Sequence, residues 1–496
     1  MNRSTAKTGP TGPTAMTGTP VATRHTAMPR KIRRAGTTSD TRGQTCVLAY
    51  SGGLDTSVAV AWLRETHGFE IVTCTGDLGS VKDLPGVQRK ALQSGARKAI
   101  VQDAREPFVR YFVWPALQAG ALYEGRYPMA TALGRPLLAK LLVDAARAEG
   151  ARYVAHGCTG KGNDQVRFDL AVGALAPEMT VIAPMRGGMN MTRDEEIDYA
   201  KARGIPVPVT KKSPYSVDEN LWGRSVEAGV LEDPWGAPPR DVYQWTVDPD
   251  EAPERAKELV IGFREGVPVS LDGRPLDGVA LIDTLNALAG RHGVGRIDQI
   301  ENRLVGIKSR EIYEAPAAVV LHQAHRALED MVLSKESLRS KSRIADEYAD
   351  LVYNGLWFSA HHQDLAAYVR STQRFVTGEI RVRLHRGTAT VVGRRSEHSL
   401  YSVSLATYGK GDAFDHKAAE GFIGVFGLSL RNQSKTQALW GPDSEAALRI
   451  PSRVARADSA AGSTAVAGER GTAPATKPGP KPGPKPGPKR AKKPRA

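Results

Sequence analysis

One short stretch, residues 50–57, limits what this chain can fold into. It reads Tyr-Ser-Gly-Gly-Leu-Asp-Thr-Ser, follows an apolar run at 46–49 and precedes a helical pattern at 58–65. A buried strand, a glycine loop and a helix N-terminus in this order create an anion site, because the loop N–H groups and the helix dipole favour negative charge at the same place. The stretch therefore predicts a phosphate-binding loop.

Two common phosphate loops are excluded by the same residues. The Gly-x-x-x-x-Gly-Lys-Ser/Thr pattern is absent, so no lysine is placed for γ-phosphate transfer, and the Gly-x-Gly-x-x-Gly pattern of dinucleotide folds is absent as well. The stretch resembles the Ser-Gly-Gly-x-Asp loop of the ATP pyrophosphatases, which hold the departing pyrophosphate while a substrate oxygen attacks the α-phosphate. A glycine-rich turn with a capping Ser or Asp is the structural alternative.

The first half of the chain alternates strand and helix patterns. Apolar runs at 47–50, 71–75, 99–101, 153–156 and 181–184 predict buried parallel strands, and stretches such as 137–149 predict helices. Thr192 and Glu195 form a capping box, which opens a helix that Gly204 ends. This alternation predicts an α/β fold with a doubly wound parallel sheet, whose ligands bind beyond the carboxyl ends of the strands.

The second half predicts an α+β domain. Helical patterns at 278–291, 315–333 and 344–353 accompany strand patterns at 297–305, 378–384 and 388–393, and residues 415–430 predict one more helix, apolar enough to need a partner surface. We therefore divide the chain into a disordered basic tail (1–44), a nucleotide-binding domain (45–210), a second domain (211–414), a C-terminal helix region (415–450) and a disordered Lys/Pro/Gly-rich tail (451–496).

Charge and cysteine content limit the partners. The formal net charge is +15, but residues 1–44 contribute +7 and residues 451–496 contribute +9, which leaves −1 for residues 45–450. Basicity therefore predicts at most weak, sequence-independent polyanion contact through the tails. No apolar run is long enough to span a bilayer, and the three cysteines lack any Cys-x-x-Cys pairing. A cytoplasmic protein without membrane contact is expected.

A second polar stretch, residues 156–168, follows the predicted strand at 153–156. It contains three glycines, with Lys161 and Arg167 to meet carboxylate or phosphate, and Asn163 and Asp164 to hold amine and ureido groups. Because it ends a parallel strand, it should open at the same sheet edge as residues 50–57. A plain turn is the alternative, but one turn does not need so many polar side chains.

With both stretches present, the chain resembles the argininosuccinate synthase family over roughly residues 45–450. Segments 121–127, 215–222, 293–298, 301–303 and 308–314 extend the resemblance. The resemblance implies condensation of citrulline with aspartate at the expense of ATP, giving argininosuccinate, AMP and pyrophosphate through a citrullyl-adenylate, in arginine biosynthesis. It also implies Mg²⁺ and a homotetramer formed through the C-terminal helix.

The resemblance assigns site residues by matching position. ATP contacts fall on Ala49, Tyr50, Ser51, Gly52, Gly53, Leu54, Asp55, Thr56, Ser57, Gly76 and Gly157. Citrulline contacts fall on Tyr127, Asn163, Arg167, Ser216, Ser225, Glu301 and Tyr313, and aspartate contacts on Thr159, Asn163 and Asp164. Catalytic roles are expected for Asp55, Ser57 and Lys161, whereas the residues that would hold Mg²⁺ are left unassigned.

Three positions depart from the family pattern. Ala132 stands where some members place a citrulline-contacting serine, Ser80 where a glutamine is usual, and Met185 where a tryptophan is common. No general base is evident: we expect His156 to be a packed histidine and Cys158 a small packed residue.

Three other function classes fit less well. A tRNA-thiolating pyrophosphatase needs a cysteine pair, and a glutamine amidotransferase needs a cysteine nucleophile in a domain of its own, and neither is present. A nucleic-acid-binding protein would use aromatic residues together with its basic ones, but the tails that carry the charge contain none.

Overall fold

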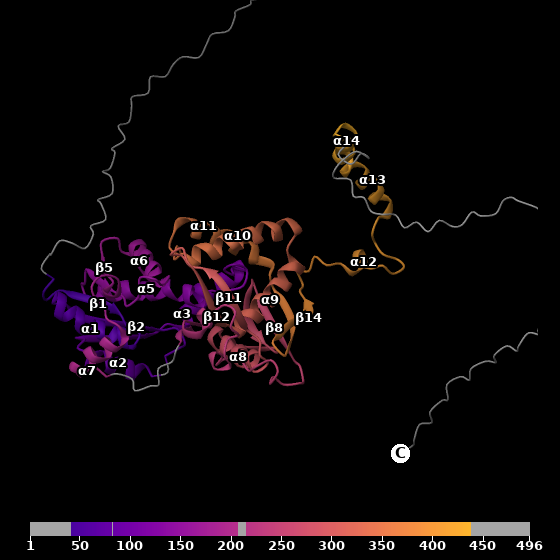
Figure 1. Ribbon diagram of the computed structural model, residues 1–496. Helices are drawn as coiled ribbons and strands as arrows, with labels where there is room; N and C mark the ends of the chain where they lie inside the picture. Colours follow the sequence, from indigo (N-terminus) through magenta and orange to yellow (C-terminus); the bar gives the residue numbers. More distant parts are fainter. Residues whose placement is uncertain (1–40, 82, 207–214, 438–496) are drawn as a thin grey trace, which may run out of the picture. The chain divides into compact units, whose positions relative to one another are not determined.

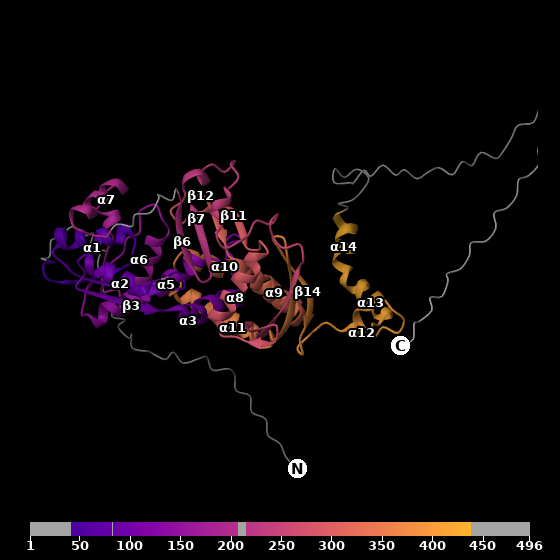
Figure 2. The ribbon, with the colours of Figure 1, turned by 90° about the horizontal axis from the view of Figure 1, so that it is seen from below.

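The computed structural model describes residues 41–81, 83–206 and 215–437 (Figures 1 and 2). Apart from residues 41–44, the two predicted tails lie outside this range. The chain divides into two compact units, one ending at Asp412 and the other beginning at Ala413. Among the described residues, no helix has both the length and the apolar character to cross a membrane.

A five-stranded parallel sheet forms the first part of the first unit. Its strands lie in the order β3-β2-β1-β4-β5, and each coincides with one of the five predicted apolar runs. The chain builds outward from β1 through β2 to β3, then crosses to the other side of β1 to form β4. The strands are β1 (Thr45–Ala49), β2 (Glu70–Asp77), β3 (Lys98–Asp103), β4 (Tyr153–Ala155) and β5 (Thr180–Ile182). The topology therefore places a switch point between β1 and β4, where doubly wound sheets bind ligands.

Helices cover both faces of this sheet, which explains why the consecutive residues Cys46, Val47 and Leu48 of β1 are all fully buried. Cys46 and Leu48 of β1 pack in one core with α1, α2 and α7, whereas Val47 packs in another core with α5 and α6 (Figure 1). On the first face lie α1 (Leu54–His67), α2 (Leu84–Gln93) and α7 (Arg193–Ala202); on the second lie α5 (Ala130–Ala148) and α6 (Asp164–Leu175). The predicted α/β fold class is confirmed.

The sequence predicted where α7 begins, but it did not predict where α5 begins. The Thr192 capping box is present: its N–H donates to the Glu195 carboxylate at 2.6 Å, and the chain leaves the helix at Gly204, with φ 65°. The helix predicted at 137–149 begins seven residues earlier, at Ala130. The seven residues before the predicted start are therefore helical as well, and Pro136 lies inside the helix.

The remainder of the first unit contains two antiparallel sheets and four long helices. The sheets have the strand orders β10-β9-β8-β13-β14 and β11-β12-β7-β6. Their strands are β6 (Ser216–Asn220), β7 (Gly223–Glu227), β8 (Lys257–Arg264), β9 (Val267–Leu271), β10 (Arg274–Pro275), β11 (Arg296–Asn302), β12 (Lys308–Glu314), β13 (Gly378–His385) and β14 (Thr388–Arg395). The helices are α8 (Gly278–Arg291), α9 (Pro316–Val332), α10 (Lys335–Tyr353) and α11 (Ala360–Thr372). The shorter helices are α3 (Arg105–Phe108), η1 (Val109–Val113), α4 (Trp114–Ala119), η2 (Pro184–Arg186), η3 (Gly229–Glu232), η4 (Arg240–Val242), η5 (Gln373–Phe375) and α12 (Val403–Ala406).

Three helices and three strands predicted in this part are present. The helix at 278–291 matches α8, and the helix at 344–353 is the second half of the longer α10. The strand predicted at 297–305 is β11, which ends at Asn302. Strands β6 to β10 and β12 were not predicted, because their side chains are mixed and their conformation depends on pairing with partner strands.

The second unit corrects the prediction of a single helix over 415–430. The chain forms α13 (His416–Phe426) and α14 (Leu428–Gln437), with Gly427 between them. Asp415 caps α13, because its carboxylate accepts hydrogen bonds from the N–H groups of Lys417 and Ala418. Large apolar side chains on both helices are exposed: Phe422, Ile423, Val425, Phe426, Leu428 and Leu430.

Candidate active site

Side chains of the loop after β1, together with Lys90 of α2, fix the conformation of that loop. Gly52 has φ 79°, a conformation that favours glycine, and its carbonyl accepts a hydrogen bond from Nζ of Lys90 at 2.7 Å. Ser57 is fully buried and donates to the carbonyl of Gly53 at 2.7 Å, while Tyr50 contacts the Ser57 hydroxyl at 2.9 Å. Ser57 therefore supports the loop from its buried side, and Ser51 and Gly53 lie on its exposed side.

The loop after β4 lies against the loop after β1. A Cβ atom on Gly157 would come within 2.9 Å of Cγ2 of Thr56, so the two loops approach more closely than a side chain at 157 would allow. Thr159 and Lys161 are exposed beyond this contact. Gly76, at the end of β2, packs instead against α5, since a Cβ there would lie 2.8 Å from Leu138 and from Leu141. The predicted sheet-edge arrangement of the two loops is present.

Two carboxyl groups meet at the first turns of α1 and α7. Asp55 lies in the first turn of α1 and Glu196 in the first turn of α7. Glu196 is 3% exposed, and its Oε1 has no hydrogen-bond partner among the described residues. Burial and the neighbouring Asp55 carboxylate raise the pKa of Glu196 to about 7. No sequence pattern points to Glu196, because its place beside Asp55 depends on how α7 packs on α1.

A cavity of about 100 Å³ follows the loop after β4 and reaches the sheet that contains β7, β11 and β12. Six of the seven predicted citrulline residues line it, together with Asp164; the exception is Ser216, which is exposed at the start of β6. The lining residues are Tyr127, Thr131, Gly162, Asn163, Asp164, Arg167, Asp218, Ser225, Glu227, Glu301, Arg303, Glu311, Tyr313 and Tyr353. Carboxylates and guanidiniums in one small space suit a zwitterionic amino acid, since each of its charges finds a partner.

Glu301 is the most enclosed acid of this cavity. It is 3% exposed, and its two carboxylate oxygens accept hydrogen bonds from the hydroxyls of Tyr353, at 2.5 Å, and Tyr313, at 2.6 Å. Burial raises the pKa of Glu301 to about 7, against the lowering effect of the two hydroxyls. The ring of Tyr313 stacks on Tyr127 at 3.8 Å, which fixes the direction of its hydroxyl.

Asp164 lies between two arginines at the mouth of the same cavity. It pairs with Arg135 at 2.8 Å and with Arg167 at 2.9 Å, and Arg135 pairs also with Asp218. Although burial opposes ionisation, the two guanidiniums lower the pKa of Asp164. Asp164 is therefore an anion whose charge the protein already balances, which suits it to hold a polar ligand by directed hydrogen bonds.

Two residues of the 156–168 stretch are structural, as expected. His156 is buried, contacts Asp169 at 3.0 Å and stacks on Phe168. Cys158 is part-buried, and burial raises the pKa of its thiol to about 12, so its thiol stays protonated at neutral pH. Of the three departures, Ala132 is fully buried on α5 and is not among the residues that line the cavity.

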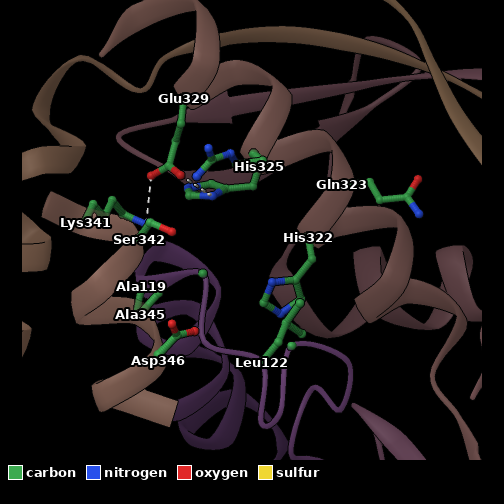
Figure 3. A pocket seen from close by; sticks show the side chains of 13 residues that line it. Ala119, Leu122, His322, Gln323, His325, Glu329, Lys341, Ser342, Ala345 and Asp346 are labelled. Atoms are coloured by element: carbon green, nitrogen blue, oxygen red, sulfur yellow. Dashed lines mark ion pairs between the residues drawn. The ribbon is translucent and has the colours of Figure 1, made fainter. Parts of the chain in front are cut away.

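A larger cavity, of about 350 Å³, lies elsewhere (Figure 3). It is bounded by α9, α10 and the segment after α4, and no predicted site residue lines it. Its wall carries a buried ion pair between Lys341 and Glu329, at 3.0 Å, beside His325. The smaller cavity, not this one, gathers the predicted substrate residues.

Several lining residues were missed by the sequence analysis. Asp218 and Arg303 lie inside segments that carried the family resemblance, so a closer reading of those segments offered a signal for them. Tyr353 offered none, because it reaches the cavity through tertiary packing, from the end of α10. Arg135 does not line the cavity but pairs from α5 with Asp164, which does, and the sequence offered no signal for it either.

Comparisons with known proteins match one family over most of the described chain. The family model described as the argininosuccinate synthase N-terminal HUP domain matches residues 45–206, and that of the argininosuccinate synthase C-terminal domain matches residues 215–433. An argininosuccinate synthase of Dehalococcoides mccartyi is 54% identical over 393 residues, which are 79% of this chain and 97% of that protein. That of Gloeobacter violaceus is 58% identical over 391 residues, 79% of this chain and 98% of that protein.

Proposed function

This chain belongs to the argininosuccinate synthase family, a family of ligases, and on that premise we propose that it joins citrulline to aspartate with cleavage of ATP to AMP and pyrophosphate. The observation that carries the proposal is the contact between Gly157 and Thr56. It joins the candidate pyrophosphate loop to the stretch that supplies Asn163, Asp164 and Arg167, so that an ATP held by the first would face an amino acid held by the second.

In the proposed order of events, the ureido oxygen of citrulline attacks the α-phosphate of ATP, and pyrophosphate leaves. The oxygen–phosphorus bond that forms converts a poor leaving group into a good one, and the amine of aspartate then displaces AMP from the ureido carbon. The chain's part is to place the reactants and to stabilise charge, with the N–H groups of the loop after β1 directed at the leaving pyrophosphate.

Mg²⁺ belongs to the proposal, with Asp55 and Glu196 as the residues that would hold it. The described residues contain no cluster of three or more His, Cys, Asp or Glu side chains suited to a metal. A pair is nevertheless sufficient, because Mg²⁺ is commonly held by one or two carboxylates together with substrate phosphates. The unpartnered, buried Oε1 of Glu196 beside Asp55 fits that requirement. When bound, the ion would neutralise charge on the pyrophosphate.

The proposal extends to assembly, location and pathway. The exposed apolar side chains of α13 and α14 support a homotetramer formed through these helices. Three free cysteines support a cytoplasmic site of action, and the reaction places the enzyme in arginine biosynthesis. Residues 1–44 and 451–496 are proposed to be dispensable for catalysis, and to account for any weak polyanion binding, because they carry the excess charge.

The test is an assay of the purified protein with ATP, Mg²⁺, citrulline and aspartate. AMP, pyrophosphate and argininosuccinate should appear in equal amounts, and omission of any one substrate should stop argininosuccinate formation. With citrulline and ATP alone, isotope label should exchange between bridging and non-bridging oxygens of ATP, because the first step is reversible. Label that stays in place until aspartate is added would favour a concerted route, and absence of argininosuccinate would refute the proposal.

A further inference from the structure

One side chain outside the predicted site contacts three of its members. Tyr353, the last residue of α10, receives a hydrogen bond from Nδ2 of Asn163 at 2.9 Å and donates one to Oε1 of Glu301 at 2.5 Å. Its backbone carbonyl accepts a third from Nε of Arg167, at 2.9 Å, and the guanidinium of Arg167 lies 4.8 Å from the centre of its ring.

These contacts leave Tyr353 a single orientation. Its ring stacks on Tyr123 with centroids 3.5 Å apart and planes 5° from parallel, and the residue is 1% exposed. The chain then turns at Gly355, with φ 77°, where a Cβ would lie 2.8 Å from Cα of Arg167. The end of α10 is therefore packed directly against the first turns of α6.

The hydroxyl of Tyr353 also determines how Asn163 faces the cavity. Oδ1 of Asn163 accepts a hydrogen bond from the N–H of Leu304 at 2.9 Å, so its amide nitrogen is the group directed at Tyr353. A continuous chain of hydrogen bonds then runs from Leu304 through Asn163 and Tyr353 to Glu301. It joins α6, at the edge of the parallel sheet, to β11 of the antiparallel sheet.

We propose that Tyr353 is a positioning residue of this enzyme: its hydroxyl locks Asn163 and Glu301 in one mutual arrangement, and so sets the affinity for the amino-acid substrates through these two residues. The inference rests on the proposed function. It goes beyond the residues assigned by family resemblance, since Tyr353 lies outside every segment that carried it. Loss of the hydroxyl would leave the Glu301 carboxylate with one donor instead of two and release the Asn163 amide.

The test is Tyr353→Phe, which keeps the ring contacts and the backbone acceptor and removes only the hydroxyl. The KM for citrulline should rise about 10-fold, the scale of a hydrogen bond to a charged group, whereas the KM for ATP should not change. The matched control is Tyr348→Phe on the same helix: Tyr348 is also fully buried, but its hydroxyl has no hydrogen-bond partner among the described residues, so every constant should stay at the wild-type value.

A pH profile separates positioning from a general loss of structure. Glu301 faces Tyr123, Tyr127, Arg167, Glu311, Tyr313 and Tyr353. We expect the citrulline KM to fall as the pH rises and Glu301 becomes ionised. Because the Tyr353 hydroxyl favours the ionised carboxylate, Tyr353→Phe should move this fall to higher pH. Replacement of Tyr353 by 3-fluorotyrosine, which keeps the shape and donates more strongly, should move it to lower pH and serves if Tyr353→Phe does not fold.

The outcomes are distinct. A wild-type citrulline KM in Tyr353→Phe, or equal losses for citrulline and ATP, would overturn the positioning role while the wild-type reaction stands. A pH profile that does not move in the fluorotyrosine protein would overturn it as well. A wild-type protein that forms no argininosuccinate would instead refute the proposed function, and this inference with it.

Discussion

Gly157 and Thr56 are in contact with no space for a methyl group between them: a Cβ on Gly157 would lie 2.9 Å from Cγ2 of Thr56. The two residues come from different loops, one after β4 and one at the start of α1. The fit matters for the reaction, because the loops are proposed to hold the two reactants.

Gly157→Ala should therefore separate the loops. We expect a loss of about 1–3 kcal/mol in the free energy of unfolding from overpacking, and a drop of about tenfold in kcat from misplacement of the reactants. Gly160→Ala is the control in the same loop, since no described atom lies within 4 Å of its Cβ position. Urea unfolding and steady-state assays measure both quantities. Equal behaviour of the two variants would contradict the close contact.

Asp55→Asn should lower kcat about 100-fold, the scale for loss of one group that stabilises charge at the reacting phosphates. The fold should be retained, because asparagine has the same shape. Asp194→Asn, at an exposed position in the first turn of α7, should stay within about twofold of wild type. Pyrophosphate release reports the rate.

The metal assignment is checked by titrating Mg²⁺. The Asp55→Asn variant should need more of the ion to reach its half-maximal rate, and an unchanged Mg²⁺ requirement would contradict the assignment.

Glu301 should make stability depend on pH. Its pKa is raised to about 7 in the folded chain by burial, above the ordinary value of 4.5. Its stabilising contribution is therefore complete below about pH 4.5 and is lost as the pH rises through 7, where the folded state must carry a buried charge. Glu301→Gln should remove this part of the slope, measured by urea unfolding between pH 5 and 8. An identical slope in the variant would show that Glu301 ionises normally.

Lys341 and Glu329 form a buried ion pair, 3% and 2% exposed. Lys341→Met leaves the Glu329 carboxylate buried without its cation and should destabilise the protein by about 3–5 kcal/mol. The double variant Lys341→Met, Glu329→Leu removes both charges and should recover much of that loss. A double variant as unstable as the single one would mean that packing around the larger cavity, rather than charge, sets the cost.

The exposed face of α13 should control assembly. Phe426 is 78% exposed and stacks on Phe422 at 5.2 Å. Phe426→Asp should lower the mass in sedimentation from that of the proposed tetramer to that of a smaller species, because a charge replaces apolar contact area. Lys417→Glu, also on α13, is the control for charge alone. A tetramer that survives Phe426→Asp would place the interface on another part of the chain.

The sequence predicted the parts of this structure that depend on local signals. The apolar runs around Val47 and Val72 specify strands, and the two glycines after β1 specify the loop that leads into α1. The parallel order of the strands then brings the loop after β4 to the same edge. All site assignments stay predictions: the structure gathers six of the seven citrulline residues around one cavity, whereas Thr159, Lys161 and Ser216 are exposed.

The rest depends on contacts that no local pattern encodes. The strand at β6 reads Ser-Val-Asp-Glu-Asn, and only its pairing with β7 makes it extended. Glu196 lies beside Asp55 because α7 packs on α1, and Tyr353 reaches the cavity because the end of α10 packs against α6. The helix expected over 415–430 is interrupted at Gly427. A single glycine can be tolerated inside a helix or can end it, and the local sequence alone does not decide which.

The hydrogen-bond chain through Asn163 also determines when the site exists during synthesis. Asn163 is separated along the sequence by 141 residues from Leu304 and by 190 from Tyr353. Such contacts close large loops and so form late in folding. A nascent chain that has completed the parallel sheet therefore still lacks the cavity lined by Asn163, Glu301 and Tyr353. The cavity is complete only once α10 has emerged, so the proposed reaction would have to wait for nearly the whole first unit to be made.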